Sequence, residues 1–388
     1  MSKIEYLGKM PDPFRRPDGS RMTAEEWYEH RAALRDFIVD MEFGGMPPRP
    51  EVVRMERMSG PKTQRGGAPV WLKIYAGTAE KQLSFMLELF VPFVPTKAKS
   101  AYAPFGEDEK YPVLLNGDGC YVTLESDTVN EARARGYVVA RFNRLEIASD
   151  YPGERRSPIY DLYPENTDFT AISAWAWGYS VCMDVLEQIS YIDETEVGIT
   201  GHSRGGKTVQ LAGATDDRFK YVCPNNSGCH GASSHRCVVT DWGERKINFE
   251  RLGNMLVNFP HWVGPKMTPY AGREQDLPYD MHYFGALIAP RYFLQCEGMQ
   301  DRYCNPVGAW QNLSAVKECF RYLGCEDHAA GWFRPGDHRH KLPDFTEFLD
   351  FMDRARAGLP LADHLKVNPF PGEALNFDWG GEESGITD

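Results

Sequence analysis

A short glycine-flanked segment constrains the fold of this chain more than any other feature. Residues 198–207 read Gly-Ile-Thr-Gly-His-Ser-Arg-Gly-Gly-Lys, which places Ser203 at the centre of a G-x-S-x-G pattern. An apolar run at 197–200 leads into the pattern, and helical spacing follows it at 208–214. A strand, a sharp turn and a helix in this order predict a strained turn that lifts the serine hydroxyl above a sheet. An ordinary strand-to-helix turn with a capping serine is the alternative interpretation.

From Tyr111 onward, short apolar runs alternate with helical patterns. Two earlier runs, 69–75 and 83–94, predict antiparallel strands, because apolar residues occupy every second position of the second run. The order of these patterns predicts an α/β fold with a mainly parallel central sheet and helices on both faces. We expect strands at 113–115, 136–141, 195–200, 219–225, 291–296 and 330–333, and helices at 169–189, 204–215, 278–287, 306–323 and 344–356.

The 388 residues are expected to form one catalytic domain with a short N-terminal extension. Hydrophobic residues make up 42% of the chain, which is enough for a sizeable core. A capping pattern at Thr23 and apolar residues at helical spacing up to Met41 predict one amphipathic helix within an extension of residues 1–60. We expect the catalytic domain to span 61–388. Its interval of about 226–290, which has only scattered helical signals, is expected to form a cap or one wall of a cleft.

Charge and cysteine content exclude several classes of partner. A net charge of -12 and a pI of about 5.4 make nucleic acid and anionic membranes poor partners. No run reaches the length of about eighteen apolar residues that suggests a membrane span. Met1 is not followed by an apolar leader segment, which predicts a cytoplasmic protein; removal of a leader would instead mean secretion. The nine cysteines lack the spacing of a disulfide scaffold and are expected to be reduced thiols, and the oligomeric state is left open.

Cysteines and histidines gather between positions 223 and 237 and raise the question of a zinc site. The residues are Cys223, Cys229, His230, His235 and Cys237. Their spacing matches no paired C-x-x-C arrangement, which is the usual pattern of a structural zinc site. We therefore expect most of them to be buried small side chains, with no metal and no cofactor.

A serine nucleophile needs a histidine base and an acid that orients the base. His338 follows directly after the last predicted strand, with His340 as its competitor. Asp301 lies on the loop after the penultimate predicted strand and is the expected acid; Glu297 and Asp241 are the alternatives. The order serine, acid, histidine along the chain is that of the α/β-hydrolase fold, which is therefore the expected architecture.

Ester cleavage passes through a negatively charged oxygen that needs hydrogen-bond donors. The backbone N–H of Arg204 is one expected donor. Its guanidinium is a second, unless the side chain only braces the turn through a salt bridge. The segment 116–119, Asn-Gly-Asp-Gly, follows a predicted strand, where a glycine-rich loop allows close backbone approach. This loop is a further candidate, although a plain turn explains it almost as well.

Five stretches carry a resemblance that goes beyond the serine motif. They are Trp-Ala-Trp-Gly at 175–178, the serine segment 201–207, Ser-Gly-Cys-His-Gly-Ala at 227–232, Leu-Ile-Ala-Pro-Arg at 287–291 and Arg-Pro-Gly-Asp-His at 334–338. Together they resemble the glucuronoyl esterases, carbohydrate esterase family fifteen of the α/β-hydrolases. The likeness covers about residues 85–365. It implies a serine hydrolase without a metal that cleaves esters of glucuronic acid.

The resemblance also assigns roles to five residues. Ser203 and His338 match the nucleophile and the base of the family. Arg204 matches an arginine that helps to form the oxyanion hole, and Lys207 matches a lysine that contacts sugar hydroxyls. Trp262 matches a tryptophan that lines the uronate site.

One position departs from the family pattern. Many members carry a glutamate immediately before the Ser-Gly of 227–228 and use it as the acid of the triad. Here that position holds Asn226, which cannot be anionic. Some bacterial members place the acid after the following strand, and their pattern favours Asp301.

The resulting prediction is a serine esterase that acts on a small carbohydrate ester or oligosaccharide, most directly a glucuronoyl ester. An acetyl xylan esterase, which removes acetate from sugars, is the first alternative. A carbohydrate-binding scaffold with a decayed triad is the second, and Asn226 is the reason for keeping it.

Overall fold

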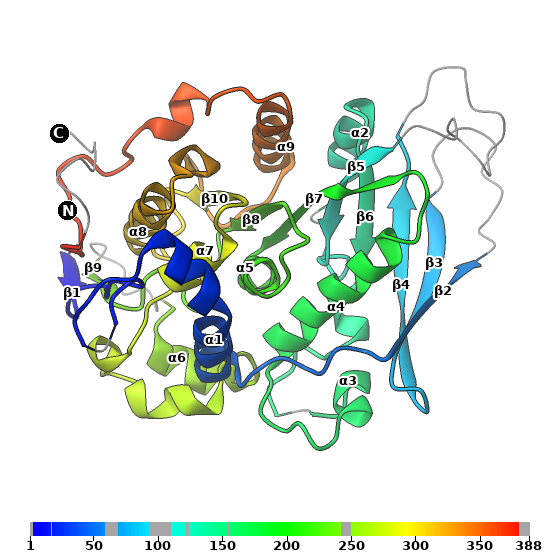
Figure 1. Cartoon of the computed structure of the whole chain (residues 1–388), viewed down its shortest axis with the longest axis horizontal. Coiled ribbons are helices and arrows are strands. Elements are labelled where there is room, and N and C mark those ends of the chain that lie inside the picture. The colour runs from blue at the N-terminus through cyan, green and yellow to red at the C-terminus, as the bar shows by residue number, and fades with distance from the viewer. Residues whose placement is uncertain are drawn as a thin grey trace.

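A nine-stranded mixed sheet runs through the molecule and carries helices on its two faces (Figure 1). The computed structural model describes residues 3–16, 18–58, 69–92, 110–121, 124–153, 155–241 and 250–379. The strand order is β11-β10-β8-β7-β5-β6-β4-β3-β2. The strands are β2 (Val52–Met58), β3 (Val70–Gly77), β4 (Gln82–Phe90), β5 (Tyr111–Asn116), β6 (Val138–Phe142), β7 (Ile192–His202), β8 (Tyr221–Asn225), β10 (Tyr292–Gly298) and β11 (Ala329–Arg334).

The sheet is parallel from β6 through β5, β7, β8 and β10 to β11. Strands β4, β3 and β2 continue it in the antiparallel sense at the other edge. The mainly parallel α/β sheet predicted from the sequence is therefore confirmed. In such sheets the loops at the carboxyl ends of the parallel strands are the usual place for a ligand site.

Nine α-helices connect and flank these strands in the described part of the chain. They are α1 (Ala24–Phe43), α2 (Ser126–Ala134), α3 (Pro158–Leu162), α4 (Ala171–Leu186), α5 (Arg204–Thr215), α6 (Leu252–Asn258), α7 (His282–Ile288), α8 (Pro306–Tyr322) and α9 (Leu342–Arg356). Short 3-10 turns are η1 (Arg144–Glu146), η2 (Pro260–Trp262), η3 (Pro265–Tyr270), η4 (Glu274–Asp276), η5 (Glu326–His328) and η6 (Asp363–Lys366).

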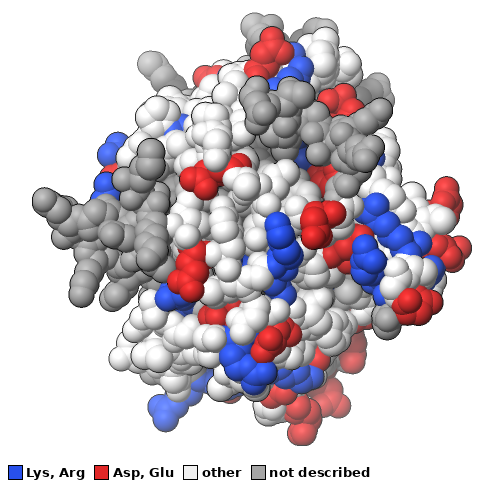
Figure 2. Space-filling model, turned by 90° about the vertical axis from the view of Figure 1, so that its left-hand side faces the viewer, with Lys and Arg blue, Asp and Glu red and all other residues white. Residues whose placement is uncertain are grey.

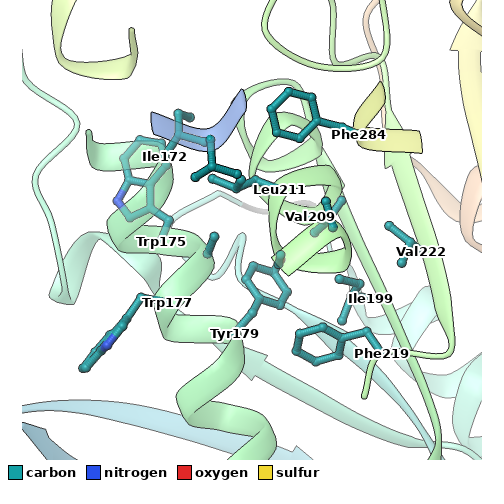
Figure 3. Close-up of a cluster of buried hydrophobic side chains, with 14 of the residues drawn as sticks. Ile172, Trp175, Trp177, Tyr179, Ile199, Val209, Leu211, Phe219, Val222 and Phe284 are labelled. Atoms are coloured by element: carbon teal, nitrogen blue, oxygen red, sulfur yellow. The ribbon is translucent and has the colours of Figure 1, made fainter. Parts of the chain in front are cut away.

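Two hydrophobic clusters cover the two faces of the sheet, because successive side chains of a strand point to opposite faces. In β5, Val113 and Leu115 belong to the larger cluster and Leu114 belongs to the smaller one. The larger cluster includes side chains of α4, α5 and α7, and Figure 3 shows Trp175, Val209 and others there. The smaller cluster includes side chains of α2 and α9. Burial on both faces explains why these strands read as continuous apolar runs.

Helix α1 begins where the capping pattern predicts a helix. The hydroxyl of Thr23 accepts the backbone N–H of Glu26 at 3.3 Å, and the Glu26 carboxylate accepts the backbone N–H of Thr23 at 2.8 Å. This reciprocal pair is a capping box. Trp27 and Phe43 are buried in the larger cluster, and α1 lies against α5, α7 and η3 (Figure 1). The helix therefore shares its hydrophobic core with the central sheet.

Three strands fall outside the sequence-based prediction. Strand β2 mixes polar and apolar residues at the edge of the sheet, so its sequence lacks a long apolar run. Strands β1 (Lys3–Tyr6) and β9 (Cys237–Asp241) pair in the antiparallel sense as a separate two-stranded sheet. The two strands lie more than two hundred positions apart in the sequence, and no local pattern predicts that they pair. Residues 93 and 94, predicted to extend β4, lie outside the described residues.

The described helices include none with the length and apolar character needed to cross a membrane. On the side that carries β1 and β9, acidic and basic side chains are interspersed (Figure 2). All nine cysteines lie within the described residues and are free thiols.

Candidate active site

Ser203 occupies a strained turn between β7 and α5. Its backbone has φ 57° and ψ -120°, a combination that residues other than glycine rarely adopt. A Cβ atom on Gly201 would lie 2.5 Å from the carbonyl oxygen of Gly205, so the turn requires glycine at 201. The backbone N–H of Ser203 donates to the carbonyl oxygen of Asn225 at 2.9 Å, which ties the turn to β8.

Four parallel strands bring the polar residues of the site to one edge of the sheet. Ser203 follows β7, Asn226 follows β8, Asp301 follows β10 and His338 follows β11. Because neighbouring parallel strands end at the same edge, residues far apart in the sequence become neighbours here.

His338 pairs with Asp301. Its Nδ1 donates to Oδ2 of Asp301 at 2.6 Å. Asp301 is 3% exposed, whereas the side chain of His338 is 35% exposed, so the imidazole is open to solvent while its acid partner is buried. The imidazole of His338 lies 4.3 Å, between ring centroids, from the imidazole of His202, the residue immediately before Ser203. A carboxylate at Nδ1 leaves Nε2 as the nitrogen that is available for proton transfer.

Two further groups hold the Asp301 carboxylate. Nδ2 of Asn226 donates to Oδ2 at 2.6 Å, and the backbone N–H of Cys304 donates to Oδ1 at 3.3 Å. Burial raises the pKa of the Asp301 carboxyl, but the hydrogen bond and charge of His338, together with these donors, lower it below its ordinary value. The carboxyl group is therefore ionised at neutral pH, as an acid that orients an imidazolium must be.

The other acids considered from the sequence lie elsewhere. Glu297 is fully buried within β10, where its Oε1 accepts from Nε2 of Gln295 at 3.3 Å. Burial, and then the charge of Asp301, raise the pKa of the Glu297 carboxyl well above its ordinary value. Asp241 belongs to the two-stranded sheet, where it pairs with Lys3. Asp301 is the acid that contacts His338 among the described side chains.

His340, the competing histidine, is 3% exposed and stacks on Phe345 with ring centroids 3.9 Å apart. Burial holds the pKa of His340 well below its ordinary value. Burial also lowers the pKa of His202 to about 3, with His338 as the second cause. His202 and His340 are therefore neutral packing partners beside His338.

Arg334 links the histidine loop to the other strands. Its guanidinium donates to Oδ1 of Asp344 at 2.5 Å, to the carbonyl oxygen of Arg339 at 2.6 Å and to Oδ1 of Asn226 at 3.5 Å. Asn226 thus receives a donor on its oxygen and gives its amide N–H to Asp301. Asn226, the residue that departs from the family pattern, therefore holds the Asp301 carboxylate in place.

The side chain of Arg204 lies on an aromatic platform. Its guanidinium carbon is 4.5 Å from the ring centroid of Trp262, and Phe259 stacks on the same tryptophan with ring centroids 4.1 Å apart. A guanidinium N–H donates to Oδ2 of Asp150 at 2.5 Å. Asp150 also accepts from Nε1 of Trp262 at 2.8 Å, and Nε2 of His261 lies 3.0 Å from its Oδ1. Sequence reasoning misses Asp150, because no local motif marks it.

Lys207 and Trp262, the two residues predicted to contact the sugar, are buried. Nζ of Lys207 donates to the carbonyl oxygens of Ser227 at 2.5 Å and Cys229 at 2.6 Å, and to Oε2 of Glu250 at 2.7 Å. All three ammonium protons have acceptors, so a sugar hydroxyl would have to replace one of them. Trp262 is 2% exposed, and the partly exposed Phe259 lies on its face.

The segment 116–119 does not supply oxyanion donors, which corrects the expectation for this loop. The N–H of Gly117 donates to the Tyr179 hydroxyl at 2.6 Å, and the N–H of Gly119 donates to the carbonyl oxygen of Phe142 at 3.0 Å. Asp118 instead accepts the backbone N–H of His202 at 2.7 Å. The loop therefore braces the serine turn, and its donors are used internally.

Comparison with known proteins gives the site its context. A family model described as fungal glucuronyl esterase matches residues 95–324, more than half of the chain. The chain belongs to the glucuronoyl esterase family. The α/β-hydrolase fold and the carboxylic ester hydrolase activity predicted from the sequence are confirmed by this membership.

Known proteins of the glucuronoyl esterase family align with most of this chain. Carbohydrate esterase MZ0003, from an unknown prokaryotic organism, is 26% identical over 400 residues, covering 90% of each protein. The 4-O-methyl-glucuronoyl methylesterase of Hypocrea jecorina is 28% identical over 337 residues, covering 86% of this chain and 66% of that protein. The solved family fifteen glucuronoyl esterase of Caldicellulosiruptor kristjansonii superposes with a TM-score of 0.78 at 26% identity, covering 95% of this chain and 96% of that one.

Proposed function

We propose that Ser203, His338 and Asp301 form the catalytic triad and that the enzyme hydrolyses glucuronoyl esters. The hydrogen bond between His338 and Asp301, at the strand ends beside the strained serine turn, carries the proposal. The family relatives from fungi, named 4-O-methyl-glucuronoyl methylesterases, supply the substrate class. The intact pairing of histidine and carboxylate argues against a decayed scaffold.

In the first half of the reaction, Oγ of Ser203 attacks the ester carbonyl and its proton passes to Nε2 of His338. Asp301 stabilises the imidazolium that forms, because its carboxylate accepts the Nδ1–H. The tetrahedral intermediate then collapses. The bond to the alcohol oxygen breaks, and His338 returns the proton to the leaving alcohol, which generates a glucuronoyl ester of Ser203.

Arg204 is proposed to stabilise the negative oxygen of the tetrahedral intermediate. Its backbone N–H lies at the first position of α5, where helix N–H groups have no acceptor within the helix. Its side chain is 28% exposed, and Asp150 holds its guanidinium on Trp262, which fixes the direction of the guanidinium before substrate arrives. Donors that are positioned in advance act on developing charge without a cost of reorganisation.

In the second half, water attacks the acyl-serine carbonyl and gives a proton to Nε2 of His338. The intermediate collapses again, the bond to Oγ breaks, and His338 returns the proton to Ser203. The products are the free uronic acid and the regenerated enzyme. Both halves of the reaction use Ser203, His338, Asp301 and Arg204.

The interval 226–290 is proposed to form one wall of the substrate cleft. It carries Phe259 and Trp262 beside Arg204, and Phe259 is partly exposed. Tyr121, at 40% exposure, also lies near the guanidinium, with its ring centroid 5.8 Å from the guanidinium carbon. Aromatic faces of this kind pack against the apolar faces of sugars. We propose that the buried Lys207 supports this wall by fixing the carbonyl groups of the 227–229 loop, and that it does not touch the sugar.

A substrate panel tests the proposal. We expect kcat/KM for benzyl and methyl glucuronate to exceed that for acetylated xylo-oligosaccharides and 4-nitrophenyl acetate by about 100-fold, roughly 2.7 kcal/mol in transition-state binding. Ser203→Ala should abolish turnover of all four substrates. The reverse preference, at the same factor, would make the protein an acetyl esterase. Turnover that survives Ser203→Ala would refute the triad itself.

A cytoplasmic location is proposed as well, on the support of nine free cysteines. In that compartment the substrate would be an imported oligosaccharide or small ester. Immunodetection in cytoplasmic and extracellular fractions of the source organism tests this point, and recovery of the protein outside the cell would refute it.

A further inference from the structure

A second group of ionisable side chains lies where α1 meets the loop between β8 and β9. Glu42 comes from the last turn of α1, and His230 and His235 come from the loop 226–236. Oε1 of Glu42 contacts Nδ1 of His230 and lies 3.0 Å from Nε2 of His235. The three side chains have no exposed surface, and their ligand atoms all lie within 4.8 Å of one another.

The carboxylate of Glu42 needs a positive charge close by. It is fully buried, and it lies at the negative end of the α1 dipole, where the last turn contains no basic residue. Among the described residues, the ion pairs of Glu42 are with His230 and His235 and include no lysine or arginine. The compensating charge must therefore lie between the carboxylate and the two imidazoles, either as protons or as a metal ion.

Neighbouring groups hold two of these side chains, those of His235 and Glu42, in place. Nδ1 of His235 lies 3.5 Å from Sγ of Cys229, so a proton there directs the lone pair of Nε2 toward Glu42. The Tyr279 hydroxyl donates to Oε2 of Glu42, which leaves Oε1 for the two histidines. The backbone N–H of His235 donates to Asp280 at 2.9 Å. Outer partners that fix a tautomer and a carboxylate in this way are typical of metal sites.

We propose that Glu42, His230 and His235 bind one divalent transition-metal ion, with zinc as the best match. Two imidazole nitrogens and one carboxylate oxygen are a ligand set that zinc uses in proteins. A single divalent ion satisfies all three atoms at once and supplies the charge that the buried carboxylate requires. Cys229 and Tyr279 act as outer partners of His235 and Glu42.

The ion would join two distant parts of the chain. Glu42 lies 188 positions before His230, which is why cysteine and histidine spacing alone gives no sign of the site. The loop that carries both histidines begins at Asn226, whose amide holds Asp301. The metal would therefore fix α1 to the loop that supports the catalytic acid. This role is structural and independent of ester hydrolysis.

The chain contains matched controls. Asp301, Cys304 and His338 also have ligand atoms within 4.8 Å of one another, so His338→Ala tests whether that group holds the ion instead. Glu297 is a second fully buried glutamate, with no histidine partner among the described residues, so Glu297→Gln is matched in chemistry and burial to Glu42→Gln.

The test measures metal content by elemental analysis of the full-length protein after dialysis. We expect about one equivalent of zinc in the wild type, His338→Ala and Glu297→Gln, and less than about a fifth of an equivalent in Glu42→Gln and His235→Asn. Protein that is unfolded, stripped with a chelator and refolded should melt at a higher temperature when Zn²⁺ is present during refolding.

Refolding of the wild type with Co²⁺ keeps the proposal testable if the variants fail to fold. The bound ion should give visible absorption bands, which are absent after refolding without metal. The site would be overturned if the wild type contained no metal, its melting temperature did not change with Zn²⁺ and it showed no absorption bands with Co²⁺. Protonated histidines would then supply the charge that Glu42 requires. Full metal content in a folded Glu42→Gln, or its loss in His338→Ala, would also overturn it.

Discussion

Two carboxylate–imidazole groups in this enzyme have similar chemistry and opposite surroundings. Asp301 and His338 lie at the carboxyl ends of parallel strands, and the imidazole is 35% exposed beside a strained serine. Glu42, His230 and His235 lie inside the protein with no exposed surface. An imidazole exchanges protons with substrate only where substrate and solvent reach it. The first group is thus suited to catalysis and the second to holding the structure together.

The difference also lies in what each carboxylate must do. Asp301 pairs with one histidine and is held by neutral donors from Asn226 and Cys304. Glu42 pairs with two histidines and Tyr279, and any cation there is enclosed. The predictions below separate the two groups by substituting one member at a time.

The largest expected effect is that of Asp301→Asn. The amide presents an N–H toward Nδ1 of His338 and favours the wrong tautomer, so kcat should fall on the order of ten-thousandfold with little change in KM. Steady-state kinetics on benzyl glucuronate measure this, with unfolding curves to show an intact fold. Activity retained within tenfold would move the acid to another residue and remove the functional contrast between the two groups.

Arg204→Met should have the next largest effect. Methionine keeps an apolar stem on Trp262 but removes the charged donor, and loss of one oxyanion donor costs about 100- to 1000-fold in kcat. Asp150→Asn keeps the guanidinium and loosens its position, so its loss should be smaller. If Arg204→Met raises KM and leaves kcat unchanged, the guanidinium binds the ground state and is not part of the oxyanion hole.

Glu42→Gln should mainly reduce stability. The substitution removes the anion that pairs with the two buried imidazoles and with any bound ion. Breaking a buried ion pair lowers the free energy of unfolding by about 3–5 kcal/mol. The shift in denaturation midpoint, multiplied by the m-value, measures this loss. We expect kcat/KM of the folded protein to fall less than tenfold. A loss of activity as large as that of Asp301→Asn would show that the two groups are not separate in function.

The sequence predicted those parts of the molecule that local patterns specify. Helix α5 begins and ends where the periodicity places it, and the strained turn follows from two glycines around Ser203. Asp301 and His338 could be proposed because they follow the last two predicted strands, where the α/β-hydrolase fold places its acid and its histidine. These inferences rest on a repeating α/β rhythm, because the loops after parallel strands gather at the same edge of a sheet.

The remaining features depend on contacts that no local pattern encodes. Asp150 holds Arg204 from 54 positions away, and Glu42 meets His230 across 188 positions. Lys207 was assigned to the sugar from the family pattern, yet Glu250 and two carbonyl groups enclose its ammonium group. Burial of a charged side chain depends on the whole fold. A sequence motif therefore identifies Lys207 but does not predict which groups surround it.

The smallest expected effect on activity is that of Glu297→Gln, which separates Glu297, the rejected acid, from Asp301. Burial raises the pKa of Glu297 in the folded state, while in the unfolded chain a glutamate ionises near about 4.3. Below that pH Glu297 is protonated in both the folded and the unfolded state, so it does not change the stability with pH. As pH rises from there toward the folded pKa, the unfolded state loses its proton and the folded state does not, so stability is lost.

Glu297→Gln removes this titration and keeps the shape of the side chain. The gain in melting temperature over the wild type should therefore be near zero at pH 4 and increase toward pH 8, while kcat/KM on benzyl glucuronate stays within about twofold. Taking the difference between the two proteins at each pH cancels the other titrating groups. A difference that is constant with pH would mean that Glu297 is ionised in the folded enzyme, and a large loss of activity would return it to the list of candidate acids.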